Sequence, residues 1–478
     1  MLDSFSPAGS VRFGSECPPG IHSLPNQRFA PPEGKPRKLG GDNIIVRDSR
    51  LIGENGPGEK ELTDILTEHA EGGERRRKLR NYYMGKNAVL SRVRPAGLPN
   101  NKTAHAFARY IVTVTGGYLI GSGITYKAPE EDRAALAELM ELYREADIPS
   151  VDVENARNAA IFGKGVELII VPEDGFLPRA YALSPENAFV VYEDDIRHRP
   201  LMGVYVGGSR DGVTKVMTFT DSTVREYVSD KGKLTLVSEK PHYFGRVPMV
   251  EYWNDENEKG DFEWVLPLID AYDSLQSDRL NDKDQFADKL LVLTGCTLDT
   301  DENGRPPWLQ LRMDKALCLP DENADARYLS GEMNESGNEI LRESLEKDIH
   351  KLSMVPDLSD VSFAGNVSGV AMKYKLMGLE QLTNMKQKWF TEGLLERMRV
   401  IGGYLRLRGG NEPDTRRVSV TYNRALPENL TETASVIRTA REAGAVSTRT
   451  MVEMLHGGGN WDEKQISDET ETIMKEVK

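Results

Sequence analysis

The sequence predicts an α+β protein of more than one domain, mainly helical, with one long β-rich segment. Apolar residues recur at three- or four-residue spacing before residue 150 and after residue 260, which is the period of one helix face. Between Val166 and Trp253, by contrast, short β-branched or aromatic runs alternate with turn residues. A chain of 478 residues is also long enough for about three domains, and it can bury more than one core.

The composition is that of a soluble globular protein. Its 61 Lys and Arg against 75 Asp and Glu leave a net charge of −14, which opposes sequence-independent adhesion to nucleic acid. No stretch approaches the roughly 18 uninterrupted apolar residues of a membrane span, and the N-terminus does not resemble a signal peptide, so we expect a cytosolic protein. Cys17, Cys296 and Cys318 lie far apart without a C-x-x-C pair, which indicates neither a disulfide framework nor a zinc site.

The N-terminal part divides into an arm and a helical region. The first 60 residues carry eight Pro and nine Gly, and we expect a flexible arm because they can bury little apolar surface. Helical spacing starts at Leu62, and the run from Glu74 to Arg94 holds eight Lys or Arg against one Glu. This basic run could contact DNA phosphates, an acidic neighbouring chain or solvent.

Two helices and a series of strands follow. We expect Asn100-Asn101-Lys102 to cap a helix over residues 103–121, and a second helix to begin near residue 128 and to stop at Pro149. Eight strands are predicted between residues 166 and 253, separated by turns such as EDG, RDG and DKG. Together they suggest a meander of hairpins.

Two acidic helices flank a small β module. Residues 261–291 are predicted to contain a helix of about 27 residues, roughly 40 Å long, and they carry eight acids against three bases. A second helix is predicted over residues 331–354, with six acids and three bases. The residues between them, 292–330, contain short β-like pieces joined by turns. We therefore expect a strongly negative face along these helices.

The rest of the chain is mainly helical. A glycine-punctuated segment with little periodicity, residues 355–370, leads into a long helix from about Ala371 to Arg406. Within that helix, Gly378 and Gly393 are candidates for bends. A strand and a final helical piece over residues 432–455 follow, and then residues 456–478 without an assigned element.

Motifs of catalysis and of cofactor binding are sparse. Gly163-Lys164-Gly165 has the lysine of a phosphate-binding loop, but it lacks the glycine spacing and the following Ser or Thr. The seven histidines form no ligand spacing of the H-E-x-x-H kind, so we expect no metal site. The chain is therefore predicted to bind no cofactor, not to be an enzyme, and to act in an assembly.

Three blocks of the sequence resemble the portal proteins of tailed bacteriophages, in the branch typical of phages with long non-contractile tails. The first block, Asn100 to Tyr126, resembles the family's Asn-Asn-Lys helix with its Gly-Tyr-x-x-Gly ending. The second, Ser353 to Glu380, contains FAGNVSGVAMKYK and is similar to the most specific of the family's motifs. The third, Arg424 to Leu455, is similar to the C-terminal region of the family. The resemblance covers about Leu62 to Asp468.

This resemblance implies a ring subunit with a β-meander wing, two stem helices, a small β clip and a helical crown. The residue ranges implied are 1–60 for an arm of no known family role, 61–260 and 371–425 for the wing, 261–291 and 331–354 for the stem, 292–330 for the clip, 355–370 for a tunnel loop, and 426–478 for the crown.

Three groups of site residues are implied by the same resemblance. The tunnel loop would face DNA with Asp357, Ser359, Asp360, Ser362, Phe363, Asn366, Ser368 and Lys373. Stem acids would line a channel: Asp278, Asp282, Glu343 and Glu346. The clip would bind partner proteins through Asp301, Glu302, Arg305, Trp308 and Arg312.

The function implied is a homo-oligomeric ring of twelve copies, as in the family, at one capsid vertex of the virion. Double-stranded DNA would pass through it during packaging and ejection without being tightly bound. The partners implied are the terminase large subunit, a head-tail connector or adaptor, and the major capsid and scaffolding proteins, with no membrane, after assembly in the cytoplasm of a bacterial host. Two alternatives stay open: a nucleic-acid-binding or processing protein that uses residues 75–94, and another ring-shaped virion connector.

Overall fold

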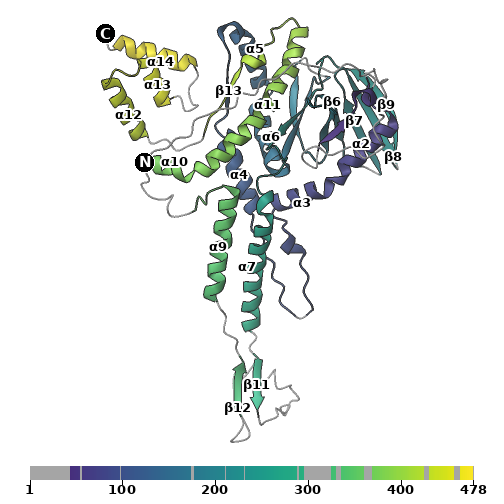
Figure 1. Cartoon of the computed structure of the whole chain (residues 1–478), viewed down its shortest axis with the longest axis vertical. Coiled ribbons are helices and arrows are strands. Elements are labelled where there is room, and N and C mark those ends of the chain that lie inside the picture. The colour runs from purple at the N-terminus through teal and green to yellow at the C-terminus, as the bar shows by residue number, and fades with distance from the viewer. Residues whose placement is uncertain are drawn as a thin grey trace, which may run out of the picture. The chain divides into compact units, whose positions relative to one another are not determined.

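A computed structural model represents the chain, and it describes most of the residues after Asn43. The described residues are 44–53, 56–96, 98–173, 177–209, 212–230, 232–287, 290–294, 325–329, 335–359, 369–424, 430–456 and 463–476. Within them, helices and strands are mixed, and the helices contribute more residues than the strands (Figure 1). The predicted α+β class is therefore confirmed.

The larger sheet has six strands in the order β1-β5-β6-β7-β8-β9. Its strands are β1 (Ile45–Arg47), β5 (Ala188–Glu193), β6 (Pro200–Val206), β7 (Val213–Phe219), β8 (Thr223–Asp230) and β9 (Lys233–Pro241). The last five pair antiparallel with their sequence neighbours, as the predicted meander requires. Short turns between alternating apolar runs favour this pairing of sequential strands.

The other predicted strands form a second sheet, so the meander is confirmed only for part of the segment. This sheet has the order β10-β3-β4, made of β10 (Met249–Trp253), β3 (Lys164–Ile170) and β4 (Arg179–Leu183). Val166, Val190 and Met249 are buried in one apolar cluster that draws on both sheets. At Gly203 a Cβ would lie 2.6 Å from the Cβ of Met249, which explains why glycine stands there.

The expected flexible arm is wrong for its last part. β1 pairs parallel with β5, and α1 (Ser49–Ile52) follows it. Ile45 and Ile52 are both buried in the same apolar cluster as the six-stranded sheet. The many Pro and Gly of the first 60 residues conceal this short apolar stretch, which gains its stability from the neighbouring strand. Residues 1–43 lie outside the described part of the chain.

Further helices pack on the strands or on one another, and the longest of them spans residues 377–407. They are α2 (Glu59–Glu71), α3 (Gly73–Tyr83), α4 (Phe107–Ile120), α5 (Arg133–Glu145), α6 (Ile148–Phe162), α10 (Gly369–Lys375) and α11 (Met377–Leu407). The expectation that a helix stops at Pro149 is confirmed, since α5 ends at Glu145, but Pro149 itself lies in the first turn of the next helix, α6. A proline is tolerated there since the first N–H groups of a helix have no partner within it.

The predicted long helix is divided near its start. α10 and α11 are separated at Leu376, two residues before Gly378. Gly393 has a different role, because α11 continues through it without interruption. A Cβ at Gly393 would lie 2.5 Å from Cδ1 of Tyr252 on β10, so glycine allows the helix to approach the sheet.

The two predicted acidic helices both form. α7 (Leu266–Ala287) follows the 3-10 turn η3 (Glu263–Val265), and α9 (Glu335–Ser353) lies beside α7 (Figure 1). Between them in sequence, β11 (Leu290–Thr294) pairs antiparallel with β12 (Asp325–Leu329). The first acidic helix thus ends before residue 291, and β structure begins earlier than expected.

The remaining elements are short. β2 (Ile124–Lys127) pairs with β13 (Ser419–Tyr422), so the chain before α5 meets the chain after α11. The C-terminal region has the helices α12 (Leu430–Glu442), α13 (Thr448–His456) and α14 (Glu463–Glu476), of which α14 was not expected as a separate helix. The turns η1 (Ala88–Ser91), η2 (Glu130–Asp132) and η5 (Thr415–Arg417) complete the described elements.

A buried ion pair links α11 to the smaller sheet. Arg397 is fully buried, and its guanidinium donates to both carboxylate oxygens of Glu167 on β3, at 2.8 and 2.5 Å. It also lies 2.6 Å from the carboxylate of Asp152 on α6. Burial raises the pKa of Asp152 to about 6 although the Arg397 charge acts in the opposite direction. A charge this deeply buried is stable only while its partners remain.

The variant Arg397→Met should therefore be far less stable to unfolding than a variant with a change on the surface. Loss of one member of a buried ion pair leaves the others uncompensated and typically costs about 3–5 kcal/mol. The midpoint of chemical unfolding, followed by tryptophan fluorescence, measures the effect. Arg416→Met is the matched control, because that side chain is 84% exposed and solvent screens its pair with Asp414, so the midpoint should barely move. Equal shifts for the two variants would contradict a structural role for Arg397.

Candidate functional site

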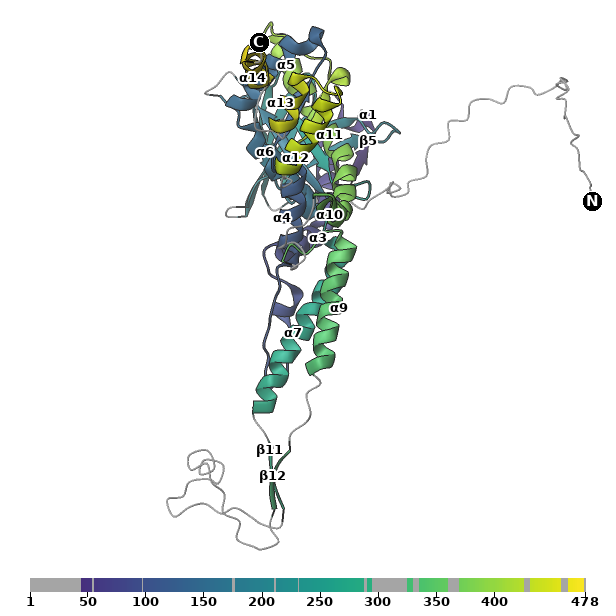
Figure 2. The ribbon, with the colours of Figure 1, turned by 90° about the vertical axis from the view of Figure 1, so that its left-hand side faces the viewer.

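α7 lies between two partners that contact opposite faces of the helix. Ser277 and Asn281, four residues apart, face the segment 87–105. Arg279 is two residues from each of them, about 200° away around a helix of 3.6 residues per turn, and contacts α9. Figures 1 and 2 both show the chain before α4 running along α7 on the side away from α9. The two predicted acidic helices thus have a third companion that sequence analysis did not anticipate.

Polar contacts hold the segment 87–105 to α7. The backbone N–H groups of Asn101 and Thr103 donate to Asn281 Oδ1 at 2.6 Å and to Ser277 Oγ at 3.0 Å. The Asn101 side chain also donates to Asp284. The prediction that Asn100-Asn101-Lys102 caps a helix is therefore wrong, since α4 begins at Phe107 without a side-chain cap. Ser277 and Asn281 instead accept hydrogen bonds from backbone N–H groups of the segment 87–105 that would otherwise lack a partner.

Asp278, predicted to line a channel, is held by two arginines of this segment. The guanidiniums of Arg92 and Arg94 both donate to its Oδ1. Partial burial disfavours the charged carboxylate, but the hydrogen bond and charge of Arg92, together with the Arg94 charge, hold the pKa of Asp278 below its usual value. The charge of Asp278 is thus balanced within one chain.

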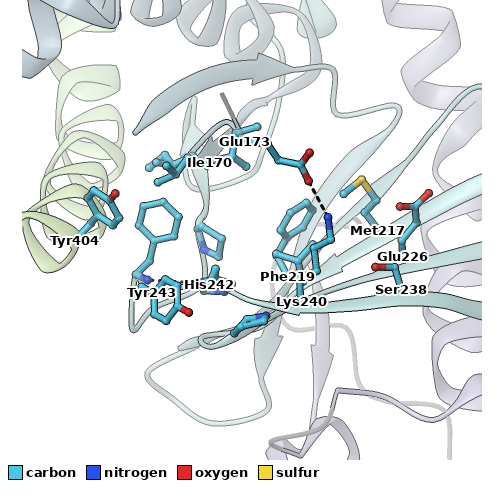
Figure 3. Close-up of a pocket in the computed structure, with 16 residues that line it drawn as sticks. Ile170, Glu173, Met217, Phe219, Glu226, Ser238, Lys240, His242, Tyr243 and Tyr404 are labelled. Atoms are coloured by element: carbon cyan, nitrogen blue, oxygen red, sulfur yellow. Dashed lines mark hydrogen bonds and ion pairs between the residues drawn. The ribbon is translucent and has the colours of Figure 1, made fainter. Parts of the chain in front are cut away.

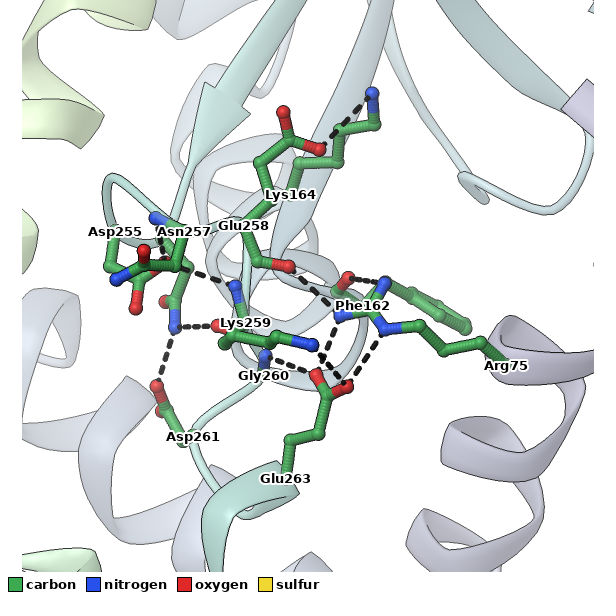
Figure 4. A network of polar contacts seen from close by, with 11 residues as sticks. Arg75, Phe162, Lys164, Asp255, Asn257, Glu258, Lys259, Gly260, Asp261 and Glu263 are labelled. Carbon is green, nitrogen blue, oxygen red and sulfur yellow. Dashed lines mark hydrogen bonds and ion pairs between the residues drawn. The ribbon is translucent and has the colours of Figure 1, made fainter. Parts of the chain in front are cut away.

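Most of the basic run from Glu74 to Arg94 is occupied in the same way. Arg75 donates to both oxygens of Glu263, at 2.8 and 2.6 Å, and to the carbonyl oxygen of Glu258 at 2.9 Å (Figure 4). Arg76 is buried, and Arg80 lies 3.2 Å from Glu186. Within the described residues, four members of the run have no carboxylate partner: the buried Arg76, which donates to the carbonyl oxygen of His69, and Arg77, Lys78 and Lys86. The run therefore serves largely to hold its own chain together.

Four of the five acids of α9 are also paired, with cations of α7 and α9. Arg342 donates to Glu346 at 2.5 Å, and Lys347 donates to Glu343 at 3.2 Å. Arg279 of α7 pairs with Glu335 and Glu339. Of the predicted channel acids, Asp282 is the one for which the described chain offers no cationic partner.

The summed charge of this region is close to neutral. Residues 87–105, 266–287 and 335–353 together carry ten acidic and eight basic residues, a net of −2. The two acidic segments alone had given −5 and −3. The difference has two causes. The charge counts from sequence left out Arg92, Arg94 and Lys102, which lie in the segment beside α7, and they included acids that lie beyond the ends of α7 and α9. The strongly negative face expected from sequence is much reduced.

Asp278→Asn should weaken the attachment of the segment 87–105 to α7. Asp278 is partly exposed, so the loss should be about 0.5–1 kcal/mol, seen as a lower thermal unfolding midpoint. Asp282→Asn removes the same charge one helical turn away and should leave the midpoint almost unchanged. An equal effect of both changes would show that general charge, and not the arginine pair, is responsible.

The first residues of the predicted tunnel loop are fixed by contacts to α4 and α9. Tyr110 Oη donates to the carbonyl oxygen of Pro356 at 2.8 Å and accepts from the Leu358 N–H at 2.9 Å. Asp357 accepts from the backbone N–H and the hydroxyl of Ser359 at 2.9 and 2.7 Å. Partial burial opposes the charge of Asp357, but these hydrogen bonds outweigh it and lower the pKa. The chain entering the loop is thus held in one conformation.

Of the other predicted loop and clip residues, the structure describes Lys373. Lys373 is exposed on α10, which begins at Gly369. Outside the described residues lie Asp360, Ser362, Phe363, Asn366 and Ser368 of the loop, and Asp301, Glu302, Arg305, Trp308 and Arg312 of the clip. Their roles remain predictions.

Tyr110→Phe should release the entrance of the loop without unfolding the chain. The Leu358 N–H would lose its acceptor, so its hydrogen–deuterium exchange should become at least tenfold faster. Tyr83→Phe is the matched control, because the described structure gives the Tyr83 hydroxyl no hydrogen bond. Unchanged exchange at Leu358 in Tyr110→Phe would contradict the role given to this hydroxyl.

A separate hollow of about 540 Å³ lies against β7, β8 and β9 (Figure 3). Its lining is largely apolar, with Phe219 and Tyr243 among its side chains. Lys240 and Glu173 pair with each other at 2.7 Å, and His242 is bound to the carbonyl oxygen of Thr220 at 2.8 Å. The charged and imidazole groups here are thus engaged with protein atoms, and the hollow does not present a nucleophile beside a base.

No helix among the described residues is long and apolar enough to span a membrane. The whole-chain comparisons instead point to viral structural proteins. A family model described as "Phage portal protein, SPP1 Gp6-like" matches residues 62–476. The portal protein of Bacillus phage SPP1 is 24% identical over 456 residues, which are 88% of this chain and 87% of that protein.

Two further proteins are similar to this chain. The portal protein of Clostridium phage phiCD119 is 24% identical over 213 residues, covering 44% of this chain and 45% of its own length. A chain in the solved neck of an empty GTA particle has 13% identity and a TM-score of 0.47, and the match covers 79% of this chain and 92% of that one.

Proposed function

The chain belongs to the phage portal protein family, and from that membership we propose that about twelve copies form a ring with a central channel for double-stranded DNA. The ring would occupy one vertex of the capsid, where DNA enters during packaging and leaves during ejection. The observation that carries this proposal is the family match over residues 62–476, which includes every region given a part in the ring.

The described elements support a division of labour along the chain. α7 and α9 would form the stem, and β11 with β12 would begin the clip, residues 292–330. The two sheets and α11 would form the wing, and α12 to α14 the crown. Residues 355–370 would form the tunnel loop, with its entrance held by Tyr110. In this scheme the rigid contacts lie in the wing and stem.

A nearly neutral stem would let DNA slide without holding it. A net of −2 for each chain gives −24 for twelve copies, a quarter of the −96 that the −5 and −3 of the two acidic segments alone would give. The basic side chains that could form lasting phosphate contacts are largely paired with acids of the same chain. Fewer cations available to phosphates mean fewer released counterions and a weaker grip.

The partners proposed follow from the clip and from the ring's place at the vertex. The clip would bind the terminase large subunit during packaging and a head-tail connector or adaptor afterwards. The outer surface would contact the major capsid and scaffolding proteins. We propose that the chain is a structural component and no enzyme, and that a separate ATPase drives the DNA. Assembly would take place in the cytoplasm of the bacterial host, and the mature ring would remain in the virion.

The alternative of a DNA-processing protein that uses residues 75–94 has less support. Five of the eight basic residues in that run are buried or paired within the chain: Arg75, Arg76, Arg80, Arg92 and Arg94. A DNA footprint needs cations that can exchange counterions for phosphates, and these residues are already engaged. The other alternative, a different ring-shaped connector, is disfavoured because the family model that matches residues 62–476 is that of portal proteins.

Loop variants test the proposed function in a packaging reaction that requires this ring. Asp360→Asn and Asn366→Ala should each reduce the DNA packaged per particle several-fold, while rings of normal mass still assemble. Asp230→Asn, at the end of β8 in the wing, is the matched control for loss of a carboxylate. Normal packaging by both loop variants would remove the tunnel-loop assignment, and failed ring assembly would mean that these residues act in folding instead.

A further inference from the structure

Three side chains near the end of α9 bring metal-ligand atoms together. Glu346 and His350 are four residues apart on α9, so both project from the same face of the helix. The turn after Ser353 returns the chain so that Asp357 lies beside them. One ligand atom from each side chain lies within 4.8 Å of the other two, and all three residues are half-buried.

Each of the three side chains is oriented by a contact outside the group. His350 Nδ1 lies 2.9 Å from the carbonyl oxygen of Val355, so Nδ1 carries the proton and Nε2 has a lone pair to offer. One oxygen of Glu346 accepts from Arg342 at 2.5 Å, and Oδ1 of Asp357 accepts from Ser359. Within the described chain, each side chain keeps a second ligand atom that has no hydrogen bond.

Such outer contacts are typical of metal ligands. A metal-binding histidine usually donates its other ring N–H to a carbonyl or carboxylate, which fixes the tautomer and the ring orientation. The aromatic rings of Phe107 and Tyr110 flank the imidazole at 6.1 and 5.6 Å and limit its rotation. Tyr110 also binds the backbone on both sides of Asp357, so two of the ligands are positioned from α4.

We propose that Glu346, His350 and Asp357 bind one divalent first-row transition-metal ion, such as Zn²⁺ or Mn²⁺, at the entrance of residues 360–368. One imidazole nitrogen with two carboxylates suits these ions better than Ca²⁺ or Mg²⁺, which prefer oxygen ligands alone. Ligands of Zn²⁺ lie about 2.0–2.2 Å from the ion, so the three atoms need to close by about 1 Å, which rotation of half-exposed carboxylates allows. Water would complete the coordination.

The surrounding charges are compatible with such an ion. The nearby cations and acids are Arg342, Lys347, Asp348 and Lys351 on α9. Arg342 donates to one oxygen of Glu346 and also to Glu339 at 2.8 Å. Its single charge is therefore divided between two carboxylates and does not neutralise Glu346 and Asp357. Two carboxylates and a neutral imidazole would offset the charge of a divalent ion. Bound metal would tie α9 to the chain at Asp357 and so stiffen the approach to the loop.

The test is metal binding by the full-length, tag-free protein after treatment with EDTA. Zn²⁺ is titrated by isothermal calorimetry, and retained metal is counted by mass spectrometry after gel filtration. We expect the native protein to retain one equivalent more per chain than His350→Gln or Asp357→Asn, with at least tenfold weaker binding in these variants. Co²⁺ should give a d–d absorption band in the native protein that both variants lose.

Asp348→Asn is the matched control, because it removes one carboxylate from the exposed surface of α9 two residues from His350. It should bind Zn²⁺ as the native protein does. The thermal midpoint without metal shows whether each variant is folded, and Glu346→Gln serves if one of the others is not. Equal stoichiometry and affinity in the native protein and the ligand variants would overturn the proposal, as would no binding at 1 mM Zn²⁺. Metal binding does not depend on ring assembly, so its failure would leave the portal function untouched.

Discussion

The folded body depends on the ion pairs that the buried guanidinium of Arg397 makes. The guanidinium joins α11 to β3 through Glu167 and to α6 through Asp152, with the rings of Tyr143 and Tyr252 at 5.7 and 5.3 Å from its carbon. Removing these charges from water costs several kcal/mol for each ion, which only close and complete pairing recovers. An arrangement of this kind tolerates one geometry, and so it fixes where the long helix lies against the sheet.

A second buried pair continues this attachment toward the stem. Lys386 lies on α11 before Arg397, and its Nζ is 2.6 Å from the carboxylate of Asp261. Asp261 also accepts hydrogen bonds from Thr115 of α4 and from Asn254. Glu263, just after it, is bound by Arg75 of α3 (Figure 4). The start of α7 is therefore joined to three helices by charges that are buried or half-buried. Force applied along α7 would be passed to α3, α4 and α11 through these contacts.

The pairing of the basic run with the acidic helix changes how passage of DNA is explained. Sequence alone suggested a repelling wall, because acids and bases were counted in separate segments. Arg92 and Arg94 lie more than 180 residues before Asp278 in the chain, yet both bind it. A wall whose charges are largely matched repels DNA only weakly and offers few cations to grip it, and this favours sliding at low energetic cost.

Periodicity predicted the elements well, whereas contacts between distant segments could not be predicted. Eight strands and the helices α4, α5, α7, α9 and α11 follow from spacing and turn residues, because these signals are local. β1 was missed since its three residues are stable only beside β5, and α6 was missed because Pro149 reads as a stop. The role of Asn101 was misread because a cap and a tertiary contact use the same side-chain chemistry.

For the candidate site residues, too, individual positions could be identified from the sequence but their partners from distant segments could not. Asp278 and Glu346 were identified through the family resemblance, but their partners Arg92, Arg94 and Arg342 were not assigned to them. The proposed metal ligands were missed because a search for H-E-x-x-H overlooks Glu346-x-x-x-His350 when the third ligand comes from a turn. A Glu or His four residues before a His on a predicted helix, followed by an acid after the helix end, is the signal that could have found them.

The most direct test of the central claim is the mass of the purified protein by light scattering, combined with negative-stain images of the same sample. The account predicts a ring with a central hole and a mass of about 640 kDa, which is twelve chains of 53.4 kDa. A stable monomer or dimer that binds duplex DNA with strongly salt-dependent affinity would contradict it.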